Sequence, residues 1–216
     1  MNINKKQLIL GLTGIVLLVF SGIRFSKTLP VLHNKMRINK IINSQGEFDY
    51  KGYAKSLAIQ VPSQIPKNLT SEQQKFVYDN VYKYSLYSGK KFAENKKFLN
   101  SERAYLTQIV TEWVFHKSVD LSRSEIPEQH KDKILQTIVD DTINKLLETR
   151  AVNVDIPIEL IMIEGKVKES YKKSIDELIK NNLVDKDKGE KAKKLSNYED
   201  LIKDSYVKIP HEENKK

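Results

Sequence analysis

The chain has 216 residues, of which 30% are charged and 39% hydrophobic, and its formal net charge is +9 at pH 7. This balance is typical of a folded polar body and excludes a wholly disordered chain. The chain has no cysteine, which excludes disulfide bonds, thiolate metal ligands and a lipid anchor attached to cysteine.

The most apolar part of the chain is the segment 7–23, QLILGLTGIVLLVFSGI, which contains no charged residue. As a helix it would span roughly 25 Å, slightly less than the ~30 Å hydrocarbon core, and flanking lysine and arginine stems extend that reach. We therefore predict a short tail at 1–6 and a single transmembrane helix at 7–23. A signal peptide cleaved after Ser21 and a buried core helix are the two alternatives.

The orientation of this anchor is read from its flanking charges. More cations follow the segment than precede it, which favours a cytoplasmic C-terminal domain under the positive-inside rule. A very short N-terminus that carries Lys5 and Lys6 is instead the usual form of a signal anchor whose N-terminus stays inside. We expect a single-pass membrane protein with an extracytoplasmic C-terminal domain.

The stretch 24–69 is basic and is interrupted by proline and glycine. We interpret it as a juxtamembrane stalk with short helical pieces at 32–42 and 50–59. Cations near an anionic leaflet each add on the order of 1 kcal/mol of attraction, although a solvated linker is the simpler alternative. Nucleic-acid binding is disfavoured because no reader motif accompanies the charge. The candidate lipid-headgroup contacts are Arg24, Lys27, Lys35, Arg37 and Lys40.

From 70 to 209 the apolar residues recur every three or four positions, which predicts a helical domain, and 210–216 is expected to be a disordered tail. The first helix is capped by Thr70 or Ser71, with a glutamine three residues later as in a capping box. Gly89 ends or kinks this helix. A second helix is predicted from Ser101 to about Leu121.

A third helix is predicted from Pro127 to about Arg150, because proline suits the first helical position. The alternating residues at 152–162 indicate an edge strand, but Pro157 favours an extended lead-in at 152–156 and a helix from about 157 to 183. The polar run 185–194 is expected to be a loop or a frayed helix. A last short helix follows Ser196, so the fold class is mainly α, with five to six helices after the anchor.

Few residues form patterns that are typical of a metal site or a catalytic site. Glu112 and His116 lie four residues apart and share a helical face, but no third ligand is marked, so a surface pair is the simpler interpretation. Asp140 and Asp141 point about 100° apart on a helix and do not form an acid–base pair by themselves. No cofactor and no enzymatic activity are expected.

Tyrosines are the most suggestive surface feature of the chain. Four of them lie between residues 78 and 87, and one helix does not bury all four rings on a single stripe. Tyrosine is enriched in protein contacts because it gives a large contact area at low entropic cost. A large mixed core with partly exposed rings is the alternative. The candidate partner-binding residues, on the condition that they are exposed, are Tyr78, Tyr82, Trp113 and Phe115.

Residues 131–209 resemble the N-terminal helical domain of SurA-like chaperones. The resemblance rests on the pattern of ILQTIVDDTINKLLETRAVNV at 134–154 and of YEDLIKDSYVK at 198–208. The family's valine-asparagine-glycine opening is missing before these helices. The resemblance implies that unfolded client chains are held without catalysis.

The sequence therefore favours a membrane-anchored, non-enzymatic scaffold that docks a protein partner through its helices. A tethered chaperone and an enzyme with a site dispersed over several helices are the alternatives.

Overall fold

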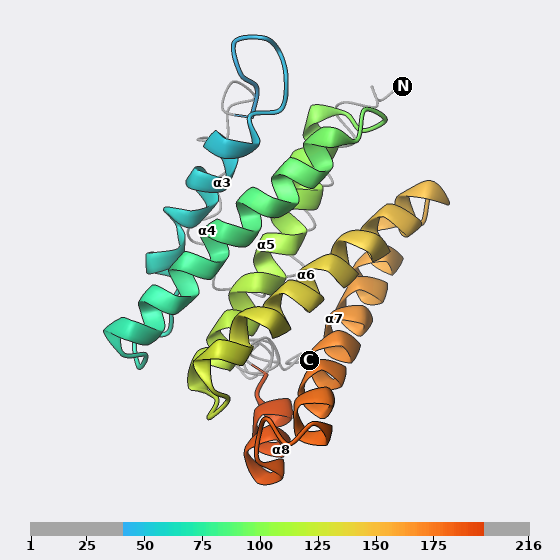
Figure 1. The fold of residues 1–216 in the computed structure, drawn as a ribbon. Coiled ribbons are helices and arrows are strands. Elements are labelled where there is room, and N and C mark those ends of the chain that lie inside the picture. The colour runs from blue at the N-terminus through green and yellow to red at the C-terminus, as the bar shows by residue number, and fades with distance from the viewer. Residues whose placement is uncertain (1–40, 197–216) are drawn as a thin grey trace, which may run out of the picture. The chain divides into compact units, whose positions relative to one another are not determined.

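The computed structural model describes residues 41–196, except for the side chains of residues 156 and 157. Within this range no strand forms, and the antiparallel bridge between Ile42 and Phe48 stands outside any named strand. The predicted mainly helical fold is confirmed. In chain order the elements are α3 (Tyr50–Ala58), the 3₁₀ helix η3 (Val61–Ser63), α4 (Ser71–Glu94), α5 (Asn100–Arg123), α6 (Glu128–Ala151), α7 (Ile156–Lys180) and α8 (Lys186–Lys194), as Figure 1 shows.

Successive long helices run in opposite directions (Figure 1). Helix α4 packs against α3 and α5, α5 against α6, and α6 against α7, while α8 packs against the last part of α7. Short connections of this kind place neighbouring helices antiparallel. The α4–α5 and α6–α7 turns consequently lie at one end of the bundle, and the α5–α6 and α7–α8 turns lie at the other.

The N-terminus of α4 carries the predicted capping box. Thr70 Oγ1 accepts a hydrogen bond from the Gln73 N–H at 3.2 Å, and Gln73 Oε1 accepts one from the Thr70 N–H at 2.9 Å. Two of the N–H groups that a helix start leaves unpaired are thereby satisfied. Helix α4 continues past Gly89, where a Cβ atom would lie only 3.0 Å from Tyr50 Cβ. This glycine therefore marks the close approach of α3 instead of ending the helix.

Helix α5 forms the centre of the fold. From Ala104 to Ser122 all but two of its residues are buried, the exceptions being Gln108 and Glu112. A helix that is buried on every side shows no amphipathic stripe. The sequence located this helix correctly but did not indicate that it is surrounded.

The connection from α6 to α7 is tighter than the extended lead-in predicted for 152–156. Asn153 adopts a φ of 53°, and the Val154 N–H donates to Thr149 O at 3.1 Å, which closes the end of α6. Helix α7 then begins at Ile156. The helical interpretation of this region is confirmed, and the strand interpretation is wrong. At the start of α6, Pro127 is the N-cap residue instead of the first helical residue.

The polar run 185–194, for which the sequence predicts a loop or a frayed helix, forms α8. The Asp185 carboxylate caps it by accepting from the N–H groups of Asp187 and Lys188 at 2.9 and 3.2 Å. Gly189 is buried because the Ile179 side chain of α7 occupies the space beside it. Packing against α7, which the local sequence does not reveal, stabilises this helix. The last predicted helix, after Ser196, lies outside the described residues.

The helical body begins earlier than the predicted boundary at residue 70. Within the described part of the expected stalk, α3 buries Tyr53, Ala54 and Leu57. This segment packs because its apolar residues recur on one side of a helix. The predicted anchor 7–23 lies outside the described residues. Within residues 41–196, no helix is long and apolar enough to cross a membrane.

Gly165 is exposed in the middle of α7, and a Cβ atom added there would meet no atom within 4 Å. We expect Gly165→Ala to raise the free energy of unfolding by about 0.5–1 kcal/mol, because alanine loses less backbone entropy in a helix. Urea titration followed by circular dichroism measures this change. A variant less stable than the unaltered chain would contradict the expectation that a methyl group at position 165 points into open space.

Candidate functional site

Two candidate contact residues, Tyr78 and Tyr82, lie on the outer side of α4. Their exposed fractions are 37% and 39%. The two rings stand one helical turn apart, so their side chains are neighbours on the helix surface. Lys75 and Asp79 form an ion pair on the same exposed side. The outer side of α4 therefore presents two aromatic rings within a charged surrounding, which we call the α4 tyrosine face.

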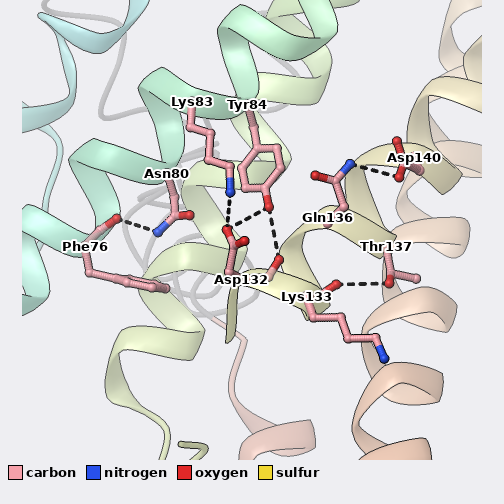
Figure 2. A network of polar contacts seen from close by, with 9 residues as sticks. All are labelled: Phe76, Asn80, Lys83, Tyr84, Asp132, Lys133, Gln136, Thr137 and Asp140. Carbon is pink, nitrogen blue, oxygen red and sulfur yellow. Dashed lines mark hydrogen bonds and ion pairs between the residues drawn. The ribbon is translucent and has the colours of Figure 1, made fainter. Parts of the chain in front are cut away.

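A polar network on the opposite side of α4 fixes how this helix is rotated (Figure 2). The Tyr84 hydroxyl donates to Asp132 of α6, to the backbone oxygen at 3.0 Å and to Oδ1 at 2.9 Å. Lys83 Nζ contacts the same carboxylate oxygen at 2.6 Å. At 100° per residue, Tyr82 points about 200° away from Tyr84. Anchoring Tyr84 on α6 therefore turns the α4 tyrosine face outward.

A second contact between α4 and α6 continues this network. The Tyr87 hydroxyl donates to Asp140 Oδ1 at 2.8 Å, and Gln136 Nε2 donates to Asp140 Oδ2 at 2.9 Å. The neighbouring Asp141 instead accepts from the Ser170 hydroxyl of α7. The two adjacent aspartates thus serve different helix interfaces, as the predicted 100° separation requires.

The tyrosines of this network are held in their protonated, hydrogen-donating form. Burial, together with the hydrogen bond to Asp132 and the charge of that carboxylate, raises the pKa of the Tyr84 phenol. The hydrogen bond to Asp140 raises the pKa of Tyr87, with a further contribution from burial. Each phenol donates to a carboxylate, and a phenolate would be repelled by that charge. The network therefore stays intact throughout the neutral range.

The other two candidate contact residues belong to the core. Trp113 and Phe115 of α5 are buried, with exposed fractions of 1% and 7%. The sequence predicts them as contact residues only if they are exposed. They are buried because the neighbouring helices surround α5. Trp113 and Phe115 therefore do not form a contact surface with Tyr78 and Tyr82.

The predicted Glu112–His116 pair exists, with His116 Nε2 3.5 Å from Glu112 Oε1. It is not a surface pair, because His116 is buried with the Trp113 and Phe115 rings beside it, their centroids 6.1 and 5.4 Å from its own. Among residues 41–196 no group of three potential metal ligands comes together.

Sequence reasoning missed one buried ion pair within α5 and one partly buried ion pair between α6 and α7. Lys117 Nζ lies 2.7 Å from Asp120 Oδ2 within α5. Arg150 of α6 contacts Glu159 Oε2 of α7 at 2.6 Å, and the Thr149 hydroxyl donates to Glu159 Oε1 at 2.7 Å. The spacing of Lys117 and Asp120 inside an apolar helix was the available signal. The Arg150–Glu159 pair joins α6 to α7, whereas the Lys117–Asp120 pair lies within the surrounded helix α5, and we interpret both as structural.

The chain matches no family model, no curated protein and no solved structure. The resemblance to SurA-like chaperones therefore stays a prediction. The candidate lipid-headgroup residues Arg24, Lys27, Lys35, Arg37 and Lys40 lie outside the described residues.

Proposed function

We propose that this chain is a membrane-tethered, non-enzymatic interaction protein that docks a protein partner through the α4 tyrosine face. The observation that carries this proposal is the outward position of Tyr78 and Tyr82 on a helix whose other side is locked to α6 through Tyr84. Rings presented on a rigid helix lose little entropy when a partner covers them. The tether is the apolar segment 7–23, with the helical body on the extracytoplasmic side.

We expect Tyr78→Ala/Tyr82→Ala to weaken partner capture at least about tenfold while the free energy of unfolding changes by less than about 1 kcal/mol. A photo-crosslinking amino acid at position 78 of the full chain, used in membranes of the native host, identifies the partner. The affinity of that partner for both forms of the chain is then measured directly.

Lys172→Ala/Lys173→Ala is the matched control, because both lysines are exposed on α7. It should bind the partner as the unaltered chain does. Equal affinity of the tyrosine variant and this control would refute the role of the α4 tyrosine face.

A further inference from the structure

Residues 41–49, which begin the described part of the chain, lie at one end of the helical bundle. The Asp49 N–H donates to Ile41 O at 2.9 Å, and Asn100 Nδ2 donates to Gly46 O at 2.9 Å. The first described residues are thereby fixed beside the start of α5. The α4–α5 turn and the α6–α7 turn lie at the same end (Figure 1). We call residues 41–49 with these two turns, and the helix ends that flank them, the entry end.

Large apolar side chains are exposed at the entry end. Of the eight exposed large hydrophobic residues in the described chain, four belong to its two turns or to the first two turns of α7. Their exposed fractions lie between 52% and 71%. Apolar exposure that is concentrated at one end of a bundle favours a contact surface there over an even scatter of single exposed residues. The four are Leu99, Val152, Ile158 and Ile161.

Exposed lysines accompany Leu99 around the α4–α5 turn. Lys90 and Lys91 occupy the end of α4, and Lys96 and Lys97 occupy the turn itself. Glu94 is the one acidic residue between Lys90 and Leu99. Lysine stems around apolar side chains match a lipid surface, where the apolar groups enter the interface and the ammonium groups meet anionic headgroups.

The connection to the predicted anchor points to the same surface. Residues 24–40 contain five lysines and arginines and no acidic residue. This stretch of 17 residues reaches at most about 60 Å when fully extended. The chain that leaves a bilayer holding residues 7–23 would therefore reach the helical body first at the entry end.

We propose that the entry end rests on the surface of an anionic lipid bilayer. Leu99, Ile158 and Ile161 lie in the interface, and the lysines of the α4–α5 turn contact headgroups. The inference rests on the membrane tether of the proposed function, not on the α4 tyrosine face. Tyr78 precedes Lys90 by twelve residues, about 18 Å along the helix axis. Docking of the entry end therefore leaves the α4 tyrosine face in water, open to a protein partner.

The test uses the absence of cysteine from the chain. Leu99→Cys and Ile161→Cys receive an environment-sensitive fluorophore, and Ile59→Cys and Leu183→Cys are matched controls, because both residues are exposed at the opposite end. The full chain is reconstituted into vesicles with about 30% phosphatidylserine and a nitroxide-labelled lipid. We expect quenching at positions 99 and 161 to exceed that at 59 and 183 at least about threefold.

The charge component is tested separately in the Leu99→Cys background. Replacing Lys90, Lys91, Lys96 and Lys97 by glutamine should reduce quenching at least about twofold, and about 0.5 M salt should act in the same direction. Lys172→Gln/Lys173→Gln is the control and should leave quenching unchanged. If the two sets of lysine substitutions reduced quenching equally, the proposed headgroup contact would be overturned.

The remaining outcomes are distinguishable. Equal quenching at all four labelled positions, with the chain still held in the vesicles, would overturn the inference and leave the tether intact. Absent quenching, combined with a disulfide-linked dimer of Ile161→Cys, would show that a second copy covers the entry end. Release of the full chain from vesicles by alkaline carbonate would reject the tether, and with it this inference.

Discussion

Raising the pH above about 10 is expected to unfold the helical body steeply. Four buried tyrosines cause this: burial raises the pKa of Tyr53, Tyr84, Tyr105 and Tyr171 above the ordinary value. The charge of Glu159 adds to the effect at Tyr105, and the charge of Asp120 adds to it at Tyr171. These phenols come from four different helices, so their ionisation affects the whole core.

The direction of the effect follows from proton binding. An unfolded tyrosine loses its proton near pH 10, whereas the folded one keeps it to higher pH. Above pH 10 the unfolded state therefore binds fewer protons, and the free energy of unfolding falls as pH rises. Below pH 10 this contribution to stability is fully present. Each tyrosine lowers the free energy of unfolding by up to about 1.4 kcal/mol per pH unit, and the four together lower it by up to about 5.5 kcal/mol per pH unit.

A total stability of about 5–15 kcal/mol is thus exhausted within about one to three pH units. Phenolate absorbance and far-ultraviolet circular dichroism of the full chain, recorded on the same samples, measure the transition. We expect four of the ten tyrosines to ionise only as the helices unfold. Tyr171→Phe should flatten the dependence of stability on pH by about a quarter. Ionisation of all ten tyrosines with unchanged ellipticity would contradict the predicted coupling.

The sequence predicted those features that local physics determines. The capping box at Thr70 and the helix after Pro127 depend on neighbouring residues alone, and the structure confirms both. The outward position of Tyr78 and Tyr82 follows from 100° per residue, so it was predictable without knowledge of any partner helix.

Features that depend on neighbouring helices were not predictable. Trp113 and Phe115 are buried because other helices surround α5. The residue pattern of one helix does not show how many helices pack around it. Helix α8 exists because Gly189 and Ala192 pack into the body, whereas its charged residues alone resemble a loop. The entry end brings Leu99 and Ile161 to one end of the bundle although 61 intervening residues separate them, which only the antiparallel topology reveals.

The buried ion pair between Lys117 and Asp120 is expected to produce the second large effect. Their side chains are 4% and 1% exposed, and the Lys117 ammonium lies 4.6 Å from the centre of the Tyr171 ring. Asp120→Ala leaves the ammonium buried without its carboxylate. Because desolvation of an uncompensated charge is costly, we expect a loss of about 3–5 kcal/mol in the free energy of unfolding.

Two comparisons separate this charge effect from a simple loss of contacts. Lys117→Met/Asp120→Ala removes both charges and should be clearly more stable than Asp120→Ala, because replacing a buried pair by apolar groups is often close to neutral. Glu148→Ala breaks the more exposed Lys145–Glu148 pair, which has the same spacing, and should cost less than about 1 kcal/mol. Urea unfolding followed through the single, buried Trp113 measures all three variants.

The same substitution should loosen α8, because the Tyr171 ring connects the ion pair to that helix. Its hydroxyl donates to Ala192 O at 3.0 Å, while its ring face contacts the Lys117 ammonium. A cation without its counter-ion draws water into this layer, and amide hydrogen exchange in α8 should then accelerate more than in α3. If Asp120→Ala costs no more than Glu148→Ala, or leaves exchange in α8 unchanged, the ion pair does not support this part of the fold.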